Sequence, residues 1–494
     1  MDFILNKKTV IINRQNERVM TMIKFGTGGW RAEIGKDFQK ENITLIAQAL
    51  AERIIELNEN DLPVVIGYDR RFLSDVAARW LAEVLAGNGI KVRVMHRSAP
   101  TPLVMHTVMK KGLHYGLEVT ASHNPSIYNG IKVIVDEGRD APVEVTENIE
   151  YRCKRIGNIK SMEFKQALAD GLIEFIENPF NDFLDDILSI LDKDAIRERG
   201  PRILFDSMHG SSSYPFNVLF YTTRCTPDQI NANKDAYFGG MMPAPTKDTL
   251  KLLADQVRDG GYDFGFGVDG DGDRLGVIDS DGEYISANDI LVLLYYYLHE
   301  YKGWKGPVVR NLATTHLLDR VAHALGEECY EVPVGFKHIS AAIDRYDAVL
   351  GGESSGGLTV RGHIHGKDSI YAAALFTEMY CKIGKKPGDL IRELRDKYGD
   401  SFFVECNMPI TPEQKEHIAK IISDSKEKDA LTMVPEFSQK PSRVNCIDGI
   451  KVYFPDDSFV ICRPSGTEPL LRIFAEGRVQ GQAEEYIESW KKFI

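Results

Sequence analysis

The chain has 494 residues, of which 43% are hydrophobic and 27% charged, and its formal net charge is −12 at pH 7. This length predicts about three to four globular domains, since one core serves roughly 100–200 residues, and the composition excludes disordered and collagen-like chains. An acidic surface is unsuited to nucleic acid or anionic lipid, so neither a nucleic-acid partner nor a membrane is expected.

The seven cysteines are scattered and never spaced as C-x-x-C, which predicts reduced thiols in a cytoplasmic protein. The N-terminus lacks the continuous apolar core of a signal peptide. The apolar run at 290–298 is far shorter than the ~20 residues that cross a bilayer, and so predicts a buried helix. Residues 1–22 are expected to be an N-terminal extension without a catalytic role, which loss of activity on their deletion would contradict.

In chain order, the patterns predict three α/β units followed by an α+β unit. An amphipathic stretch at 42–57 and β-branched runs at 63–69 and 90–95 are typical of a βαβ layer. A second such pattern starts with the strand-like run at 201–206, with a long helix-like stretch reaching Gly260, and a third follows the apolar helix. The expected domains are 23–170, 171–288, 289–399 and 400–494.

Three aspartates alternate with glycines directly after the strand-like run 262–268. They are Asp269, Asp271 and Asp273. Alternate side chains of extended backbone point the same way, glycine permits tight curvature, and hard oxygen ligands select Mg²⁺ or Ca²⁺. An EF-hand is excluded, because its sixth and twelfth positions require glycine and glutamate but are here Arg274 and Ser280. A solvated acidic turn stays open as the alternative, whereas the glycine spacing at 265–270 lacks the helix N-terminus of a dinucleotide site.

The segment T-A-S-H-N-P at 120–125 follows the strand-like run YGLEV, and its proline predicts a turn that exposes Ser122 and His123. By itself this could be an ordinary Asn-Pro turn, and it is not the G-x-S-x-G elbow of hydrolases. Lys132 follows a few residues later. A serine, a lysine and a metal loop together suit phosphoryl transfer, in which positioning and charge neutralisation supply most of the catalysis.

Other polar loops follow later strand-like runs. The loop R-P-S-G-T-E-P at 463–469 offers an arginine fork, hydroxyls and free backbone N–H groups, which suit a phosphate, although a plain hairpin turn is the alternative. The loop G-G-E-S-S-G-G at 351–357 suits sugar hydroxyls, or is a plain glycine-serine loop. The segments 25–31 and 335–338 add cations that, taken singly, could be surface charge.

Together these loops resemble the α-D-phosphohexomutase family, which includes phosphoglucomutases, phosphomannomutases and phosphoglucosamine mutases. The motifs T-A-S-H-N-P, D-G-D-G-D-R and R-P-S-G-T-E-P occur in family order, and the resemblance runs from Phe25 to Arg472. It implies four domains in a heart shape, three similar α/β domains and a C-terminal α+β domain that resembles the TATA-binding protein.

By this resemblance Ser122 is the phosphorylated serine, and Mg²⁺ is held between its phosphate and the three aspartates. Arg31 and His123 lie beside it, and Lys132 is the general acid/base. The expected substrate-binding residues are Arg274, Lys337, His338, Glu353, Ser355, Arg463, Ser465, Gly466 and Thr467. Of these, Glu353 and Ser355 hold sugar hydroxyls, and the last four hold the non-reacting phosphate.

The implied reaction interconverts glucose 1-phosphate and glucose 6-phosphate through glucose 1,6-bisphosphate, which is both intermediate and activator. The expected partner is therefore a small hexose phosphate, and the chain is expected to be a monomer or a homodimer. A site sealed from water is needed to retain the intermediate, and the last domain is the expected lid.

The sequence departs from the family pattern at two places. Ser354 stands where subgroups of the family have glutamate, methionine or glutamine, and Gly28 stands where many members have serine. The G-F-K stretch at 335–337 favours glucose, with a phosphomannomutase or a dual enzyme as the alternative. A sugar-phosphate phosphatase and a non-catalytic sugar-phosphate sensor are the more remote alternatives.

Overall fold

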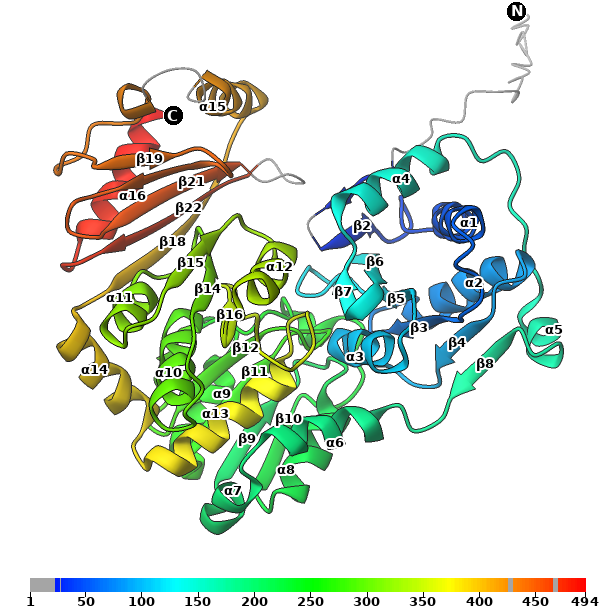
Figure 1. Ribbon diagram of the computed structural model, residues 1–494, viewed down its shortest axis with the longest axis horizontal. Helices are drawn as coiled ribbons and strands as arrows, with labels where there is room; N and C mark the ends of the chain where they lie inside the picture. The colour runs from blue at the N-terminus through cyan, green and yellow to red at the C-terminus, as the bar shows by residue number, and fades with distance from the viewer. Residues whose placement is uncertain (1–22, 27, 425–429, 465–469) are drawn as a thin grey trace, which may run out of the picture.

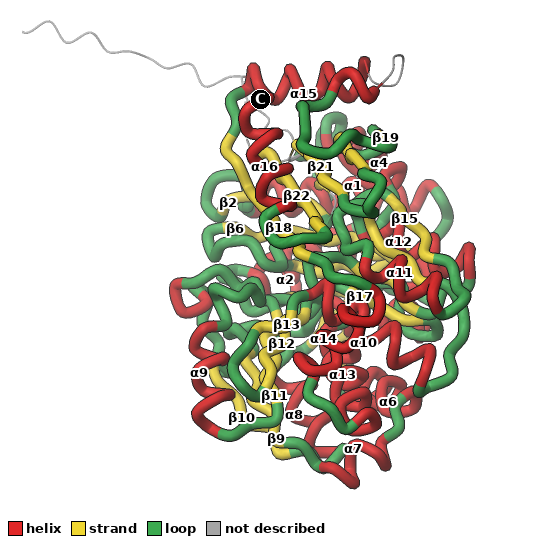
Figure 2. The backbone as a smooth tube through the Cα atoms, turned by 90° about the vertical axis from the view of Figure 1, so that its left-hand side faces the viewer, coloured by secondary structure: helices red, strands yellow, loops and turns green. Residues whose placement is uncertain are grey.

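The computed structural model describes residues 23–26, 28–424, 430–464 and 470–494, so the expected extension at 1–22 lies outside the described residues. Its strands form four separate sheets, and each sheet with its helices is a domain, numbered I to IV along the chain. Figure 1 shows them in an arc, with domain I at the right, domain II at the bottom, domain III above it and domain IV at the upper left. Domain IV lies at one end of the molecule in Figure 2, and helix α7 (Lys193–Arg199) of domain II lies at the other.

Domain I is built on an eight-stranded sheet in which β6-β5-β3-β4 is the central part. Its strands are β1 Phe25–Gly26, β2 Gly29–Glu33, β3 Val64–Tyr68, β4 Val92–Met95, β5 Tyr115–Val119, β6 Tyr128–Val135, β7 Arg139–Asp140 and β8 Ile173–Ile176. Its helices are α1 Lys40–Glu56, α2 Ser74–Gly87, α3 Thr101–Lys111, α4 Val143–Cys153 and α5 Phe164–Ala169. Because β8 pairs with β4, this sheet continues past residue 170, where the sequence placed the division.

Domain II carries a five-stranded sheet in the order β10-β9-β11-β12-β13. The strands are β9 Arg202–Asp206, β10 Thr226–Ile230, β11 Phe264–Val268, β12 Leu275–Asp279 and β13 Tyr284–Ile285. The helices are α6 Phe180–Ile190, α7 Lys193–Arg199, α8 Ser213–Thr222 and α9 Lys251–Gly260. The prediction of one long helical stretch up to Gly260 is wrong, because β10 interrupts it. This strand contains Pro227 and lies at the sheet edge, where a missing N–H is tolerated and the apolar pattern is weak.

Domain III has a four-stranded sheet in the order β15-β14-β16-β17. The strands are β14 Val308–Asn311, β15 Cys329–Val332, β16 Leu350–Gly352 and β17 Leu358–Val360. The helices are α10 Ala287–Glu300, α11 Leu317–Ala324, α12 Phe336–Tyr346, α13 Ser369–Ile383 and α14 Pro387–Tyr398. The predicted buried helix at 290–298 is confirmed as the middle of α10. No helix in the described part of the chain is both long and apolar enough to cross a membrane.

Domains II and III share one apolar core, to which α3 of domain I also contributes, whereas domain IV has its own. Domain IV is an antiparallel sheet in the order β18-β22-β21-β20-β19, with two helices. The elements are β18 Phe402–Pro409, α15 Pro412–Asp424, β19 Arg443–Asn445, β20 Ile450–Tyr453, β21 Phe459–Pro464, β22 Leu470–Gly477 and α16 Gln482–Phe493. The predicted architecture of three α/β domains and one α+β domain is confirmed.

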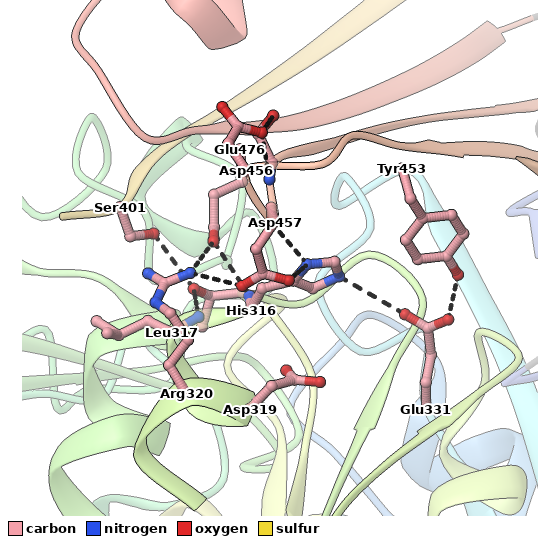
Figure 3. A network of polar contacts seen from close by, with 12 residues as sticks. His316, Leu317, Asp319, Arg320, Glu331, Ser401, Tyr453, Asp456, Asp457 and Glu476 are labelled. Carbon is pink, nitrogen blue, oxygen red and sulfur yellow. Dashed lines mark hydrogen bonds and ion pairs between the residues drawn. The ribbon is translucent and has the colours of Figure 1, made fainter. Parts of the chain in front are cut away.

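A polar network joins domain IV to domain III (Figure 3). Glu331 of β15 accepts hydrogen bonds from Tyr453 and from Lys451, the latter at 2.6 Å. Asp457 accepts one from Arg320 at 3.0 Å and lies 3.2 Å from His316 Nδ1. Polar side chains dominate this contact, so the last domain is held to the third by directional bonds as well as by a small apolar cluster.

Candidate functional site

The predicted loops of domains I, II and III occupy equivalent places in their three sheets. In each domain a loop leaves the carboxyl end of a parallel strand and returns as the adjacent antiparallel strand, β5 to β6, β11 to β12 and β16 to β17. Ser122, Asp269 and Glu353 follow these strand ends. Ligands commonly bind beyond the carboxyl ends of strands, and the fold brings these three loops together.

Ser122 lies at the tip of the first loop and is 1% exposed. The prediction that the turn exposes this serine is wrong, because the acidic loop of domain II lies against it. The φ of Ser122, 51°, is in the left-handed region that residues other than glycine seldom adopt. Its Oγ lies 3.0 Å from Oδ2 of Asp269 and 3.2 Å from Nδ1 of His123. The hydroxyl of domain I therefore meets the acidic loop of domain II directly.

The three aspartates are fully buried, and one oxygen of each lies within 4.8 Å of the others. Oδ1 of Asp271 and Oδ1 of Asp273 are buried and accept no hydrogen bond from the described residues. Buried carboxylate oxygens are costly unless they are paired or bind a metal. Three converging carboxylates with free oxygens are the donor set of a hard cation such as Mg²⁺, so the residues present fit that ion.

Burial and the charges around the three aspartates together shift the pKa values of Asp269 and Asp273 in opposite directions. Burial and the charges of Asp273 and Asp271 raise the pKa of Asp269 well above its usual range. Burial alone would also raise the pKa of Asp273, but the charges of Lys132, Lys367 and Arg274 outweigh it and hold that pKa well below the usual range. Like charges at this spacing cannot all ionise without added positive charge, which again favours a cation at this place.

Lys132 comes from β6 and reaches across the domain boundary. Its ammonium donates to Asp271 at 2.7 Å and to Asp273 at 3.0 Å. Burial alone would lower the pKa of Lys132, but these two charges raise it, so the amine carries a proton here. The lysine therefore pairs with two members of the trio, while the third, Asp269, contacts Ser122.

Arg31 contacts the loop that carries Ser122, and His123 contacts the serine itself. Arg31 of β2 donates from Nη1 to Asn124 Oδ1 at 2.6 Å. Burial and the charges of Arg274 and Arg31 lower the pKa of His123 well below its usual range, so its imidazole is neutral at pH 7. Arg31 therefore supplies positive charge to the serine loop, and His123 supplies a polar but uncharged neighbour.

Arg274 points back at the acidic loop that precedes it. Its backbone N–H donates to Asp269 Oδ1 at 3.0 Å, and its Nε lies 3.7 Å from Asp273 Oδ1. The contact of Nε with Asp273 is longer than a good ion pair, and this nitrogen is buried with no hydrogen-bond partner among the described residues. The guanidinium is therefore available to a further anion.

Glu353 holds the third loop in shape. Its carboxylate accepts from Asn311 at 3.3 Å and from Ser355 at 3.1 Å, and it is 7% exposed. The N–H of Ser354 donates to Thr314 Oγ1 at 3.1 Å. This hydrogen bond holds the backbone of Ser354, the residue at which the sequence departs from the family pattern. This loop contacts domain II, because the N–H of Leu275 donates to the carbonyl of Gly356 at 3.0 Å.

Asp448 links the predicted Arg463 of domain IV to the backbone just ahead of the predicted cations of domain III. This aspartate accepts from Arg463 Nη2 at 2.9 Å and from the N–H of Val334 at 2.9 Å, just ahead of Lys337 and His338. Burial and the charge of Lys337 lower the pKa of His338. The remaining predicted residues of the fourth loop, Ser465, Gly466 and Thr467, lie outside the described residues.

Two polar residues of this site had no signal in the motifs. Lys367 lies just before the N-cap of α13 and places Nζ 3.0 Å from Asp273 Oδ2. Thr101, at the start of α3, donates its hydroxyl to Asp271 Oδ2 at 2.7 Å. The sequence offers only one indication of Lys367, namely a lysine directly before a helix-capping aspartate. The contacts of Lys367 and Thr101 themselves could not be predicted, because each joins residues of different domains.

The packing of the two glycines of β11 argues against a dinucleotide-binding site at 265–270. A Cβ on Gly265 would lie 2.6 Å from Val257 Cγ2, and one on Gly267 would lie 2.4 Å from Leu250 Cδ2. These glycines let α9 and the residue before it pack onto the strand. Their role is packing, and no helix N-terminus follows them.

Comparison with protein families gives four successive matches along the chain. Residues 22–160, 181–282 and 286–398 match the models described as phosphoglucomutase/phosphomannomutase alpha/beta/alpha domains I, II and III. Residues 409–490 match the C-terminal domain of the same family.

Similar proteins of known name span the same length. A phosphoglucomutase/phosphomannomutase of Thermococcus kodakarensis is 29% identical over 95% of this chain and 98% of its own. A "probable phosphoglucosamine mutase" of Methanothermobacter thermautotrophicus is 28% identical over 95% and 97%, and a phosphoglucomutase of Komagataeibacter xylinus is 26% identical over 92% and 87%.

Solved structures agree in fold. A Thermus thermophilus protein provisionally assigned as a phosphomannomutase superposes with a TM-score of 0.82 at 26% identity, over 95% of this chain and 98% of its own. The Aspergillus fumigatus N-acetylphosphoglucosamine mutase, solved with GlcNAc-6P and magnesium, gives 0.56 at 13% identity, over 97% and 96%, which is a likeness of fold alone.

Proposed function

Since this chain belongs to the phosphoglucomutase/phosphomannomutase family and is a phosphohexomutase, we propose that it interconverts glucose 1-phosphate and glucose 6-phosphate through a phosphorylated Ser122. The observation that carries the proposal is the 3.0 Å contact between Ser122 Oγ and Asp269 Oδ2. A serine hydroxyl buried against an acidic trio of another domain has no role in the packing of either. It is the arrangement expected of a phosphate carrier beside a metal site.

The proposed chemistry moves one phosphoryl group at a time. The bond between phosphorus and Ser122 Oγ breaks as a bond forms to the free hydroxyl of the hexose phosphate, which gives glucose 1,6-bisphosphate. Lys132 gives its proton to the leaving Ser122 Oγ and takes up the proton of the attacking hydroxyl, so protons and charges balance. After the bisphosphate turns over, its other phosphoryl group returns to Ser122 by the reverse step.

The carboxylates Asp269, Asp271 and Asp273 would hold Mg²⁺. That ion would neutralise charge on the transferring group and, by sharing Asp271 and Asp273, weaken their hold on the Lys132 proton. Arg31 and Arg274 add positive charge where the equatorial oxygens of phosphorus gain negative charge. His123 is proposed to orient the serine through its 3.2 Å contact.

The rest of the proposed site binds and orients the substrate. Glu353 would accept hydrogen bonds from sugar hydroxyls, and Ser355 would donate to them. The non-reacting phosphate would be held by Lys337, His338 and the loop of Arg463, Ser465, Gly466 and Thr467. The position of Glu353 and Lys337 on domain III and of Arg463 on domain IV, away from the serine domain, supports a substrate bridged between domains.

Glucose is the preferred sugar in this proposal because of the G-F-K stretch at 335–337. Mannose phosphates are the second candidate, supported by the double name of the Thermococcus relative. The test is a coupled assay with the 1-phosphates of glucose, mannose and glucosamine, in the presence of Mg²⁺ and the bisphosphate.

Two variants make the test specific for the serine. Ser122→Ala should abolish isomerisation of every sugar, while Ser126→Ala, in the same loop, should retain it. Isomerisation by the Ser122→Ala variant would overturn the proposal. Release of inorganic phosphate in place of isomerisation would identify a phosphatase, and binding without turnover a sensor.

A further inference from the structure

A second arginine, Arg71, lies behind the serine loop and was not singled out by any motif. It follows β3 and is 1% exposed, which is rare for a residue that must stay charged. Burial of a guanidinium is costly unless all its donors are used and a carboxylate is near. What Arg71 binds therefore indicates why it is there.

Four backbone carbonyls of one short segment converge on this guanidinium. Nη2 donates to the carbonyls of Ser122 and Asn124, each at 2.6 Å. Nη1 donates to those of Pro125 and Tyr128, at 2.9 and 3.0 Å. The loop from Ser122 to the start of β6 is thus wrapped around a single side chain.

Asp69, two residues earlier, orients both Arg71 and the serine. Its carboxylate accepts from the N–H of Arg71 at 2.9 Å and lies 3.3 Å from the Arg71 Nε. The same carboxylate accepts from Thr120 Oγ1 at 2.7 Å, and Thr120 Oγ1 accepts from the N–H of Ser122 at 2.8 Å. The backbone of Ser122 is therefore fixed on its N–H side through Thr120 and on its carbonyl side by Arg71.

The outer face of the guanidinium is closed by domain II. Its centre lies 4.8 Å from the ring centroid of Phe238, a cation–π distance. A Cβ on Gly270 would lie 3.1 Å from the Ser122 carbonyl oxygen and 3.4 Å from the Phe238 ring. The acidic loop of domain II therefore presses on the same carbonyl that Arg71 holds.

We propose that Arg71, oriented by Asp69, is a positioning residue that holds Ser122 in its left-handed conformation and so aims Oγ at the acidic trio. This rests on the proposed function of Ser122. Without four fixed donors the loop can relax toward ordinary negative φ, because a serine at φ 51° is strained. Relaxation would move Oγ away from Asp269 without altering any residue that touches the sugar.

Only arginine supplies the required donors. The guanidinium offers five N–H groups in a rigid fork, whereas a lysine ammonium offers three on one atom. Arg71→Lys keeps the charge and loses the fork, so it tests geometry apart from electrostatics. Arg70 provides the matched control, because it is the adjacent arginine and donates one hydrogen bond, to the carbonyl of Ala232 at 2.8 Å.

The experiment compares kcat, KM for the hexose phosphate and the extent of Ser122 phosphorylation by intact mass after incubation with glucose 1,6-bisphosphate. Arg71→Lys should lower kcat about 100-fold, the effect of a misplacement near 1 Å, and leave KM within about threefold, since substrate contacts are untouched. Arg70→Lys should keep kcat within about twofold of the wild type. A purely structural role would lower the melting temperature without this split between kcat and KM.

A kcat of Arg71→Lys close to that of the wild type overturns the inference, as does a rise in KM at constant kcat. If Arg71→Lys does not fold, Thr120→Val replaces it, because valine keeps the buried volume and removes the hydroxyl between Asp69 and Ser122. Thr120→Val should lower kcat about tenfold. An unchanged kcat of this variant overturns the inference. A wild-type chain that takes up phosphate on Ser122 but isomerises no sugar would refute the proposed function alone. In that case Arg71→Lys should still take up phosphate on Ser122 more slowly than the wild type does. An unchanged rate of phosphorylation would overturn the inference.

Discussion

The ammonium of Lys367 lies 3.0 Å from Oδ2 of Asp273, so a side chain of domain III reaches the acidic trio of domain II. Lys132 of domain I donates to the same oxygen, also at 3.0 Å. Three domains thus contribute charge to one carboxylate, and the site is complete only when all three are associated.

The first prediction concerns this lysine. Lys367→Met should lower kcat/KM by about 100-fold or more, because a preorganised charge beside the transferring phosphoryl group is removed. Steady-state kinetics with saturating Mg²⁺ measures it. Lys385→Met is the control, since Lys385 is exposed and pairs only with Glu393 among the described residues. Equal activity of the Lys367→Met and Lys385→Met variants would remove Lys367 from the site.

The second prediction concerns the metal. Asp271→Asn should weaken Mg²⁺ binding at least about tenfold, because a neutral amide replaces a charged oxygen ligand. Isothermal titration calorimetry with Mg²⁺ alone reports this without any activity measurement. Asp281→Asn, in the exposed turn beyond β12, is the control and should bind Mg²⁺ as the wild type does. Unchanged Mg²⁺ binding by the Asp271→Asn variant would exclude this carboxylate as a ligand.

A third prediction concerns the contact between domains III and IV (Figure 3). Glu331→Gln removes the charge that faces Lys451 at 2.6 Å and Arg310 at 2.7 Å and should destabilise that contact by roughly 2–3 kcal/mol. Calorimetric unfolding and limited proteolysis of domain IV measure it. Glu328→Gln, at an exposed residue just before the same strand, should leave the unfolding temperature and the proteolysis pattern unchanged. Unfolding of the Glu331→Gln variant at the wild-type temperature would show that the network contributes little.

The fourth prediction is a pH dependence of stability at the junction of domains I and II. His106 of α3 is 2% exposed and lies 2.8 Å from Asp186 of α6, with Lys110, His363 and Asp368 also close. Burial lowers the pKa of His106, outweighing the hydrogen bond to Asp186. The unfolded chain therefore binds the proton first as the pH falls below about 6.5, and stability is lost across that window.

Urea unfolding between about pH 7.5 and about pH 5.5 tests this sign. His106→Gln should flatten the loss, which cannot exceed about 1.4 kcal/mol per pH unit for one group. His114→Gln provides a control of opposite sign, because the hydrogen bond to Asp136 raises the pKa of His114. The stabilisation from His114 is present below about pH 6.5 and is lost as the pH rises through the raised value. A loss of stability on acidification that is as steep in the His106→Gln variant as in the wild type would contradict the assignment for His106.

Local pattern was sufficient for most elements and for the position of two polar loops directly after their strands. The strands β5 and β11 and the helix α10 are strongly apolar, and the polar loops that follow the two strands carry Ser122 and the three aspartates. By contrast, the polar edge strand β10 was missed, since a strand that is half exposed and contains proline lacks the usual alternation.

By itself the sequence determined the fold class, the family and the residue types of the site, because strand periodicity and short motifs are properties of neighbouring residues. Only the tertiary structure decided which of those residues meet. The contacts of Ser122 with Asp269, of Lys132 with Asp271 and of Lys367 with Asp273 each cross a domain boundary. The role of Arg71 was hidden for the same reason, since it binds backbone carbonyls about 50 residues away, and a carbonyl leaves no mark in the sequence of side chains.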